Sequence, residues 1–252
     1  MPAASAADRV LVALDVERPA DAEALLDRLE GVLSGCKIGS QLFTAAGPAV
    51  VEHARKRGWR VFLDLKYHDI PSTVAGAVRE ATRLGVALLT VHASGGVRMM
   101  RAAAEAAARA ADEFGCPRPR CLAVTVLTSL DRRALDVELG VPATVEAHVL
   151  HLAQLAREAG LDGCVASPRE VRTLRLALGP GWVIVTPGIR PRSALAAAPT
   201  ARPPDAGDDQ VRVATPAAAL AAGADYLVVG RPITAAADPR AAAEALLREL
   251  AA

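Results

Sequence analysis

The chain has 252 residues, of which 52% are hydrophobic and 3% aromatic, and its formal net charge is +1. It is long and apolar enough to bury a large core, and the lack of a basic field and the scarcity of aromatic residues argue against a nucleic-acid-binding protein. The four cysteines, Cys36, Cys116, Cys121 and Cys164, include no C-x-x-C pair. This spacing argues against a zinc site or a disulfide framework.

The first eight residues, MPAASAAD, have neither the cationic start nor the apolar core of a signal peptide. We expect residues 1–8 to form a short disordered tail. No apolar run in the sequence is long enough to span a membrane. The sequence therefore predicts a soluble protein of the cytoplasm.

Short apolar runs alternate with longer helical patterns along the rest of the chain. Eight runs are predicted strands: VLVALD (10–15), GCKIG (35–39), VFLDLK (61–66), ALLTVH (87–92), CLAVTVLT (121–128), GCVAS (163–167), WVIVTPG (182–188) and YLVVGR (226–231). Helical patterns occur at 22–31, 72–85, 101–115, 145–160, 166–179, 216–224 and 239–250. In the segment 72–85, apolar residues recur at helical spacing and a glycine follows as a stop signal.

Eight strand–helix units in a chain of this length are typical of an α/β protein with the (β/α)8 TIM-barrel fold. We therefore expect residues 9–252 to form a single barrel domain. A doubly wound open sheet is the alternative, but it usually carries a G-x-G-x-x-G turn after an early strand. Here the first strand continues into ALDVERP. One irregular segment, at 190–210, separates the seventh and eighth strands, and loops of that length are usually functional or disordered.

Charged side chains gather at the ends of the first three predicted strands. Asp15 follows the first strand, Lys37 lies in the second, and Asp64 and Lys66 end the third. Strand ends of a TIM barrel meet at one mouth, where active sites lie. Only three of the 29 Lys and Arg residues are lysine, and lysine, unlike arginine, can release a proton. A structural salt bridge is the alternative for one Asp–Lys pair; two lysines with three aspartates, Asp69 included, favour a catalytic site. Asp69 lies beyond the strand and can point into this mouth or toward a neighbouring subunit.

The last two strand ends carry a second signal. Gly188 and Arg190 follow the seventh strand, and Gly230 and Arg231 follow the eighth. Phosphate sites of TIM barrels are commonly built from these two loops. Glycine lets backbone N–H groups approach the anion, and arginine supplies two parallel donors. The sequence therefore predicts a substrate with a phosphate at one end that reacts near Lys66 at the other.

Several stretches resemble the orotidine 5'-phosphate decarboxylase family, most closely its bacterial form. They are LDV, KIGSQLF, DLKYHDIPSTV, VTVLTS, TPGIRP, GDDQVRVATP and DYLVVGRPIT, and they run in order from Asp15 to Thr234. The string D-x-K-x-x-D-I-P-x-T is the most specific, although related sugar-phosphate barrels share part of it. The resemblance implies loss of CO2 from C6 of orotidine 5'-phosphate, giving UMP, with no cofactor and no metal.

The resemblance also implies a role for each matching residue. The catalytic array would consist of Lys37, Asp64, Lys66 as proton donor, and Asp69. In a homodimer, Asp69, Ile70 and Thr73 would complete the site of the partner subunit. The substrate-binding residues implied are Asp15 at the ribose hydroxyls, Thr128 at the pyrimidine, Pro187, and Arg190, Gln210, Gly230 and Arg231 at the phosphate. The segment 190–210 is expected to close over the phosphate and exclude water.

Two other functions remain open. One is a related barrel that acts on sugar phosphates with magnesium; such proteins share D-x-K-x-x-D but carry an acid near the position of Lys37, so Lys37 favours the pyrimidine substrate. The other is a catalytically silent nucleotide-binding or scaffold barrel, against which the complete charged array argues.

Overall fold

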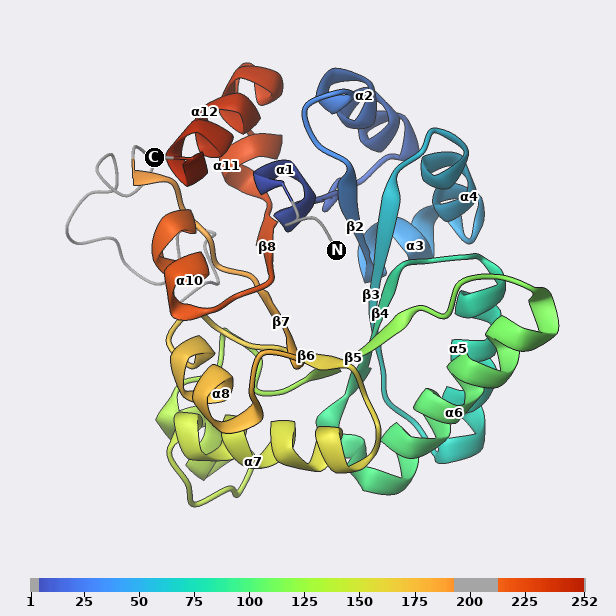
Figure 1. Ribbon diagram of the computed structural model, residues 1–252, viewed down its shortest axis with the longest axis vertical. Coiled ribbons are helices and arrows are strands. Elements are labelled where there is room, and N and C mark those ends of the chain that lie inside the picture. Colours follow the sequence, from blue (N-terminus) through green and yellow to red (C-terminus); the bar gives the residue numbers. More distant parts are fainter. Residues whose placement is uncertain (1–4, 193–212, 252) are drawn as a thin grey trace.

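The computed structural model describes residues 5–192 and 213–251 of the chain. Eight parallel strands form a closed barrel in chain order, with helices around it (Figure 1). The strands are β1 (Val10–Ala13), β2 (Gly35–Gly39), β3 (Arg60–Tyr67), β4 (Leu88–His92), β5 (Arg120–Val124), β6 (Gly163–Val165), β7 (Val183–Thr186) and β8 (Tyr226–Val229). This topology confirms the predicted (β/α)8 TIM barrel.

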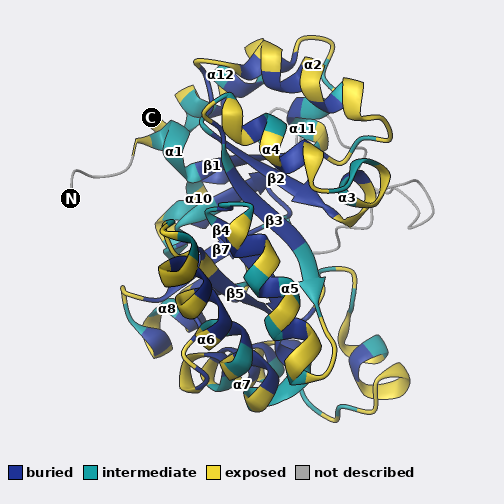
Figure 2. Ribbon diagram, turned by 90° about the vertical axis from the view of Figure 1, so that its right-hand side faces the viewer, coloured by how far each residue is buried: buried dark blue, intermediate teal, exposed yellow. Residues whose placement is uncertain are grey.

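The helices pack one face against the barrel and expose the other, as Figure 2 shows. They are α1 (Ala6–Arg9), α2 (Pro19–Leu29), α3 (Ser40–Ala46), α4 (Ala49–Lys56), α5 (Pro71–Arg83), η1 (Ala93–Gly95), α6 (Gly96–Phe114), η2 (Ala134–Glu138), α7 (Val145–Glu158), α8 (Val171–Leu178), α10 (Pro216–Ala222), α11 (Arg231–Thr234) and α12 (Pro239–Ala251). No helix in these described ranges is long and apolar enough to cross a membrane.

Two apolar layers hold the barrel together. The inner layer fills the barrel and consists of Leu11, Ala13, Phe62, Leu88, Leu122, Val183, Val185 and Val228. The larger outer layer lies between the strands and the helices. Because the strands are buried on both faces, they read in the sequence as continuous apolar runs rather than as an alternating pattern. Three cysteines belong to the outer layer, Cys36, Cys121 and Cys164, and burial raises the pKa of each thiol to about 12.

The N-terminal segment differs from the expected disordered tail. Residues 6–9 form α1, which begins with a capping box between Ser5 and Asp8. The hydroxyl of Ser34 donates to the Asp8 carboxylate at 3.0 Å, and the Arg60 guanidinium donates to the Asp8 carbonyl. These contacts stabilise a helix too short to form alone. The prediction of disorder is therefore wrong for residues 5–8; residues 1–4 lie outside the described residues.

The strand predicted at 121–128 is shorter in the structure, where β5 ends at Val124. The hydroxyl of Thr125 donates to the Val165 carbonyl at 2.8 Å, and the ladder with β6 stops at Val124. The following residues, 126–128, turn toward the mouth of the barrel and line its cavity. The π-helix η2 then interrupts the connection to α7.

Candidate active site

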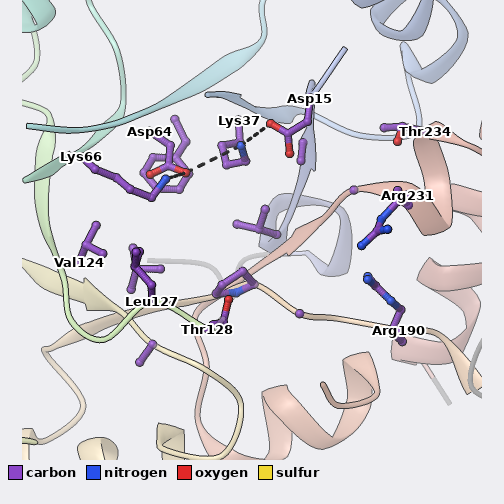
Figure 3. A pocket seen from close by; sticks show the side chains of 18 of the residues that line it. Asp15, Lys37, Asp64, Lys66, Val124, Leu127, Thr128, Arg190, Arg231 and Thr234 are labelled. Atoms are coloured by element: carbon purple, nitrogen blue, oxygen red, sulfur yellow. Dashed lines mark hydrogen bonds and ion pairs between the residues drawn. The ribbon is translucent and has the colours of Figure 1, made fainter. Parts of the chain in front are cut away.

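A cavity of about 490 Å³ opens at the carboxyl ends of the strands. Its lining comes from β1, β2, β3, β5, β6, β7 and β8 or from the loops that follow them. The lining residues are Ala13, Asp15, Lys37, Phe62, Asp64, Lys66, Val124, Val126, Leu127, Thr128, Val165, Ala166, Pro187, Gly188, Arg190, Val228, Gly230, Arg231 and Thr234. Charged side chains stand at two separate ends of this cavity, and apolar side chains lie between them (Figure 3).

One end of the cavity holds a chain of alternating charges. Lys37 Nζ donates to Asp15 Oδ1 at 2.8 Å and lies 3.8 Å from Asp64 Oδ2. Lys66 Nζ donates to the same Asp64 oxygen at 2.9 Å. The Asp64 carboxylate thus lies between two ammonium groups, and its side chain is 12% exposed. Because buried charges are stable only when paired, Lys37 and Asp64, whose side chains are 10% and 12% exposed, depend on these ion pairs.

Lys66 reaches this position from an unusual backbone conformation. Its φ angle is +52°, in the left-handed region, which costs about 1–3 kcal/mol for a residue other than glycine. The pairing of β3 with β4 shifts between Leu63 and Tyr67, so Lys66 lies in an irregular stretch of the strand. Its N–H donates to the side-chain oxygen of Thr90 at 2.9 Å. The hydroxyl of Thr90 in turn donates to Asp64 Oδ1 at 3.1 Å.

Gly39, at the end of β2, leaves room for the ion pair beside it. A β-carbon at this position would lie 3.0 Å from Lys37 Nζ and 3.1 Å from Asp15 Oδ1. Both distances are shorter than ordinary van der Waals contacts. A side chain at position 39 would therefore displace Lys37 or Asp15.

The other end of the cavity is cationic. The guanidinium groups of Arg190 and Arg231 point toward one another across it (Figure 3). Gly188 has a φ of +75°, which favours glycine at this turn. Arg190 is fixed by a short bridge in which its N–H donates to the Ala214 carbonyl at 2.9 Å, while the Ala214 N–H donates to the Gly188 carbonyl at 3.2 Å. Two guanidinium groups on a fixed backbone suit a phosphate ester.

The segment after β3 lies outside the cavity of its own chain. Asp69, Ile70 and Thr73 are exposed and are absent from the cavity lining. Asp69 Oδ1 accepts the N–H of Ile70 at 2.6 Å, and Ile70 is 63% exposed. Of the other predicted site residues, Asp15, Thr128, Pro187, Arg190, Gly230 and Arg231 line the cavity with the charged chain, whereas Gln210 lies outside the described residues.

Two histidines stand beside Lys66. The rings of His68 and His92 stack with centroids 5.1 Å apart, and His92 Nδ1 lies 2.6 Å from the Ser94 hydroxyl oxygen. Burial lowers the pKa of His92 first, and the charges of His68 and Lys66 lower it further. His92 therefore favours the neutral form beside the ammonium.

Some members of the site are not among the residues predicted from the sequence. Phe62, Val124 and Leu127 form part of the apolar lining, but they belong to runs in which every apolar residue looks alike. Thr90 lies inside an apolar run, and only the geometry reveals its contacts to Lys66 and Asp64. The importance of Gly39 is likewise evident only from the short distances between a β-carbon there and the Lys37 and Asp15 side chains.

As a whole, the cavity can hold an elongated anion. The guanidinium end can bind a phosphate group, and the ammonium of Lys66 at the other end can stabilise negative charge or donate a proton. Within the described residues, 5–192 and 213–251, no group of three or more His, Cys, Asp or Glu side chains is arranged to hold a metal ion.

Known proteins resemble this chain over nearly its whole length. The sequence profile described as "Orotidine 5'-phosphate decarboxylase / HUMPS family" matches residues 8–246. Orotidine 5'-phosphate decarboxylase of Moorella thermoacetica is 55% identical over 245 residues, which cover 97% of this chain and 93% of that protein. The protein of the same name from Halorhodospira halophila is 52% identical over 244 residues, covering 97% and 96%. The crystal structure of orotidine 5'-phosphate decarboxylase from Lactobacillus acidophilus matches with a TM-score of 0.81 at 36% identity, covering 97% of this chain and all of that one.

Proposed function

Because the chain belongs to the Orotidine 5'-phosphate decarboxylase / HUMPS family, we propose that it decarboxylates orotidine 5'-phosphate to UMP in pyrimidine biosynthesis. The reaction breaks one carbon–carbon bond and needs no oxidant or reductant. The observation that carries the proposal is the cavity itself. It joins the Lys66–Asp64 pair at one end to Arg190 and Arg231 at the other.

In the proposed reaction, the bond between C6 and the carboxyl carbon breaks, CO2 leaves, and the electron pair remains on C6. The ring offers no neighbouring carbonyl to accept that pair, so the barrier must be lowered by roughly 20 kcal/mol, near the top of the range for enzymes. No side chain in the cavity lining suits a covalent electron sink. Electrostatic stabilisation by a preorganised cation is therefore the main contribution.

Lys66 supplies that cation. Its ammonium, held by Asp64 at 2.9 Å, stabilises the carbanion as it forms and then transfers a proton from Nζ to C6. This transfer yields UMP, and the neutral amine regains a proton from solvent. Asp64 and Lys37 keep Lys66 aimed at the reacting carbon, since Asp64 lies between the two ammonium groups.

The phosphate of the substrate binds far from the reacting carbon. Arg190 and Arg231 form the cationic end of the cavity, with the backbone of Gly188 and Gly230 beside them. Binding energy gained there orients the ring against Lys66, because energy from a remote group can be used at the reacting centre. Asp15 holds the ribose hydroxyls, and Thr128 and Pro187 contact the nucleotide between the two ends.

We also propose that the active form is a homodimer. Asp69, Ile70 and Thr73 lie exposed at the end of β3 and the start of α5 and do not line the cavity of their own chain. An exposed isoleucine between two polar residues suits a subunit interface. In the dimer, these three residues complete the site of the partner subunit.

The related magnesium-dependent activity on sugar phosphates is the second candidate within this family. The donor set favours the pyrimidine substrate, since Lys37 Nζ already occupies the space between the carboxylates of Asp15 and Asp64. A divalent cation at that position would have to displace the ammonium.

The test is a decarboxylation assay on the purified protein. Orotidine 5'-phosphate is added with EDTA, and the absorbance change of the pyrimidine is followed. We expect turnover that EDTA leaves unchanged. No turnover of orotidine 5'-phosphate by folded protein, or turnover of a sugar phosphate that requires magnesium, would contradict the proposal.

A further inference from the structure

Thr90 is a fully buried residue of β4 with two polar contacts at the charged end of the cavity. Its hydroxyl oxygen accepts the N–H of Lys66 at 2.9 Å, and its hydroxyl proton is donated to Asp64 Oδ1 at 3.1 Å. Its exposed fraction is 0%, and it does not line the cavity. A contact with substrate is thus not its role.

The two contacts close a ring of hydrogen bonds. Lys66 Nζ donates to the second oxygen of Asp64 at 2.9 Å, so both the backbone and the ammonium of Lys66 are tied to one carboxylate. The backbone connection runs through Thr90. Only a group that accepts and donates at the same time can close such a ring, and a hydroxyl does both.

The ring forms where the strand departs from regular pairing. The register of β3 against β4 shifts between Leu63 and Tyr67, and Lys66 has a φ of +52°. In a regular parallel ladder the N–H of this residue would reach a backbone carbonyl. Here it reaches a side chain of the neighbouring strand instead, so the hydroxyl of Thr90 replaces a missing ladder bond.

We propose that Thr90 is a positioning residue: its hydroxyl holds the irregular turn of β3 so that the Lys66 ammonium and the Asp64 carboxylate keep a fixed geometry. The catalytic consequence rests on the proposed decarboxylation, in which Lys66 is the proton donor. The structural part, a hydroxyl that holds the Lys66 amide, stands without it.

Three variants separate positioning from a general contribution to stability. Thr90→Val removes the hydroxyl at nearly constant volume, and Thr90→Ser keeps it. Thr82→Val is the matched control, because Thr82 is also fully buried and its hydroxyl donates to the Val78 carbonyl of α5, away from the cavity. Steady-state kinetics with orotidine 5'-phosphate are measured for all three.

We expect Thr90→Val to lower kcat about 10- to 100-fold with KM within about 3-fold of wild type, since misplacement of a reacting group acts on the chemical step. Thr90→Ser is expected to recover most of the loss, and Thr82→Val to behave as wild type. The proposal is overturned if Thr90→Val keeps kcat within about 3-fold of wild type, if Thr90→Ser is as impaired as Thr90→Val, or if Thr82→Val loses as much.

Amide hydrogen exchange tests the ring without relying on activity. In wild-type protein the Lys66 amide should exchange at least about 10-fold more slowly than the same amide in an unfolded chain, because a hydrogen-bonded amide exchanges only on opening. In Thr90→Val it should exchange at least about 10-fold faster than in wild type, with the Val12 amide unchanged. If the wild-type protein does not decarboxylate orotidine 5'-phosphate, the proposed function is wrong. The exchange measurement still tests whether the Thr90 hydroxyl holds the Lys66 amide. A Lys66 amide that exchanges without protection in the wild-type protein would contradict the proposed hydrogen bond to Thr90. This result is informative even if Thr90→Val does not fold.

Discussion

Among residues 5–192 and 213–251, Lys66 is the one residue other than glycine with a positive φ angle. Such strain persists where the surroundings over-determine the conformation. At Lys66 the backbone is held by Thr90 and the ammonium by Asp64. The strain thus coincides with the residue to which we assign proton donation.

Replacing Lys66 tests that assignment at the residue scale. We expect Lys66→Ala to lower kcat by at least about 10³-fold, because both the proton donor and the cation are lost. The matched control is Lys56→Ala, which removes an exposed lysine at the end of α4 and should leave kcat unchanged. A Lys66→Ala protein with kcat near wild type would exclude Lys66 as the donor.

Gly39 provides a second test at this scale. The β-carbon of Gly39→Ala would press on Lys37 Nζ and Asp15 Oδ1, so we expect kcat/KM to fall about 10-fold by displacement of the ion pair. Gly181→Ala is the control, since a β-carbon there meets nothing within 4 Å. Equal kinetics of the two variants would mean that the space at Gly39 does not matter.

At the scale of the element, the sequence predicts which strand ends carry the charged side chains better than it predicts how those side chains contact one another. Strand ends of a TIM barrel converge, so the grouping of Asp15, Lys37, Asp64 and Lys66 follows from the strand assignments alone. The irregular pairing of β3 with β4 cannot be predicted in this way. Residues that face into and out of the barrel still alternate along VFLDLKY, so the sequence pattern is that of a regular strand. The contribution of Thr90 depends on that irregularity and is therefore hidden as well.

The end of β5 is a second feature that the sequence does not predict correctly. The run CLAVTVLT is rich in β-branched residues and predicts a strand to residue 128. The structure ends the strand at Val124. The backbone N–H and the hydroxyl of Thr125 both donate to the carbonyl of Val165, and the chain then turns over the cavity. A turn that a side chain fixes by bonding to a neighbouring strand is a tertiary effect that local propensity does not report.

The stacked pair of His68 and His92, at the ends of β3 and β4, should make stability depend on pH. The pKa of His92 is lowered from its usual value of 6.5 by burial, then by His68 and Lys66. Below pH 6.5, His92 therefore binds a proton more readily in the unfolded state than in the folded state. The free energy of unfolding should fall as pH drops from 6.5 toward the lowered pKa.

Chemical denaturation at neutral and mildly acidic pH measures this dependence. We expect His92→Gln to lose less stability on acidification than wild type. His148→Gln serves as the comparison, because burial also lowers the pKa of His148 on α7, with His151 contributing. An unchanged pH dependence in His92→Gln would contradict the assignment.

At the scale of the whole molecule, the barrel separates two charged ends across one cavity. The charged chain comes from the loop after β1 and from β2 and β3, and the guanidinium end from the segments after β7 and β8. Parts of the sequence that are far apart thus meet only when the barrel closes between β1 and β8. Asp69, Ile70 and Thr73 are exposed and do not line this cavity, which is why we propose that they act in a partner subunit.

Mixing two inactive variants tests the shared site. Lys66→Ala and Asp69→Ala proteins are combined under conditions that allow subunit exchange. A hybrid dimer holds one intact site, and random exchange makes half of the dimers hybrid, so activity should recover to about a quarter of wild type. No recovery after verified exchange would mean that each subunit carries a complete site of its own.

The most direct test of the whole account is a crystal structure of the protein with UMP bound. We predict the phosphate between Arg190 and Arg231, and Lys66 Nζ about 3 Å from C6 of the ring, within reach for proton transfer. A ligand bound with C6 remote from Lys66, or with its phosphate away from the two arginines, would contradict it.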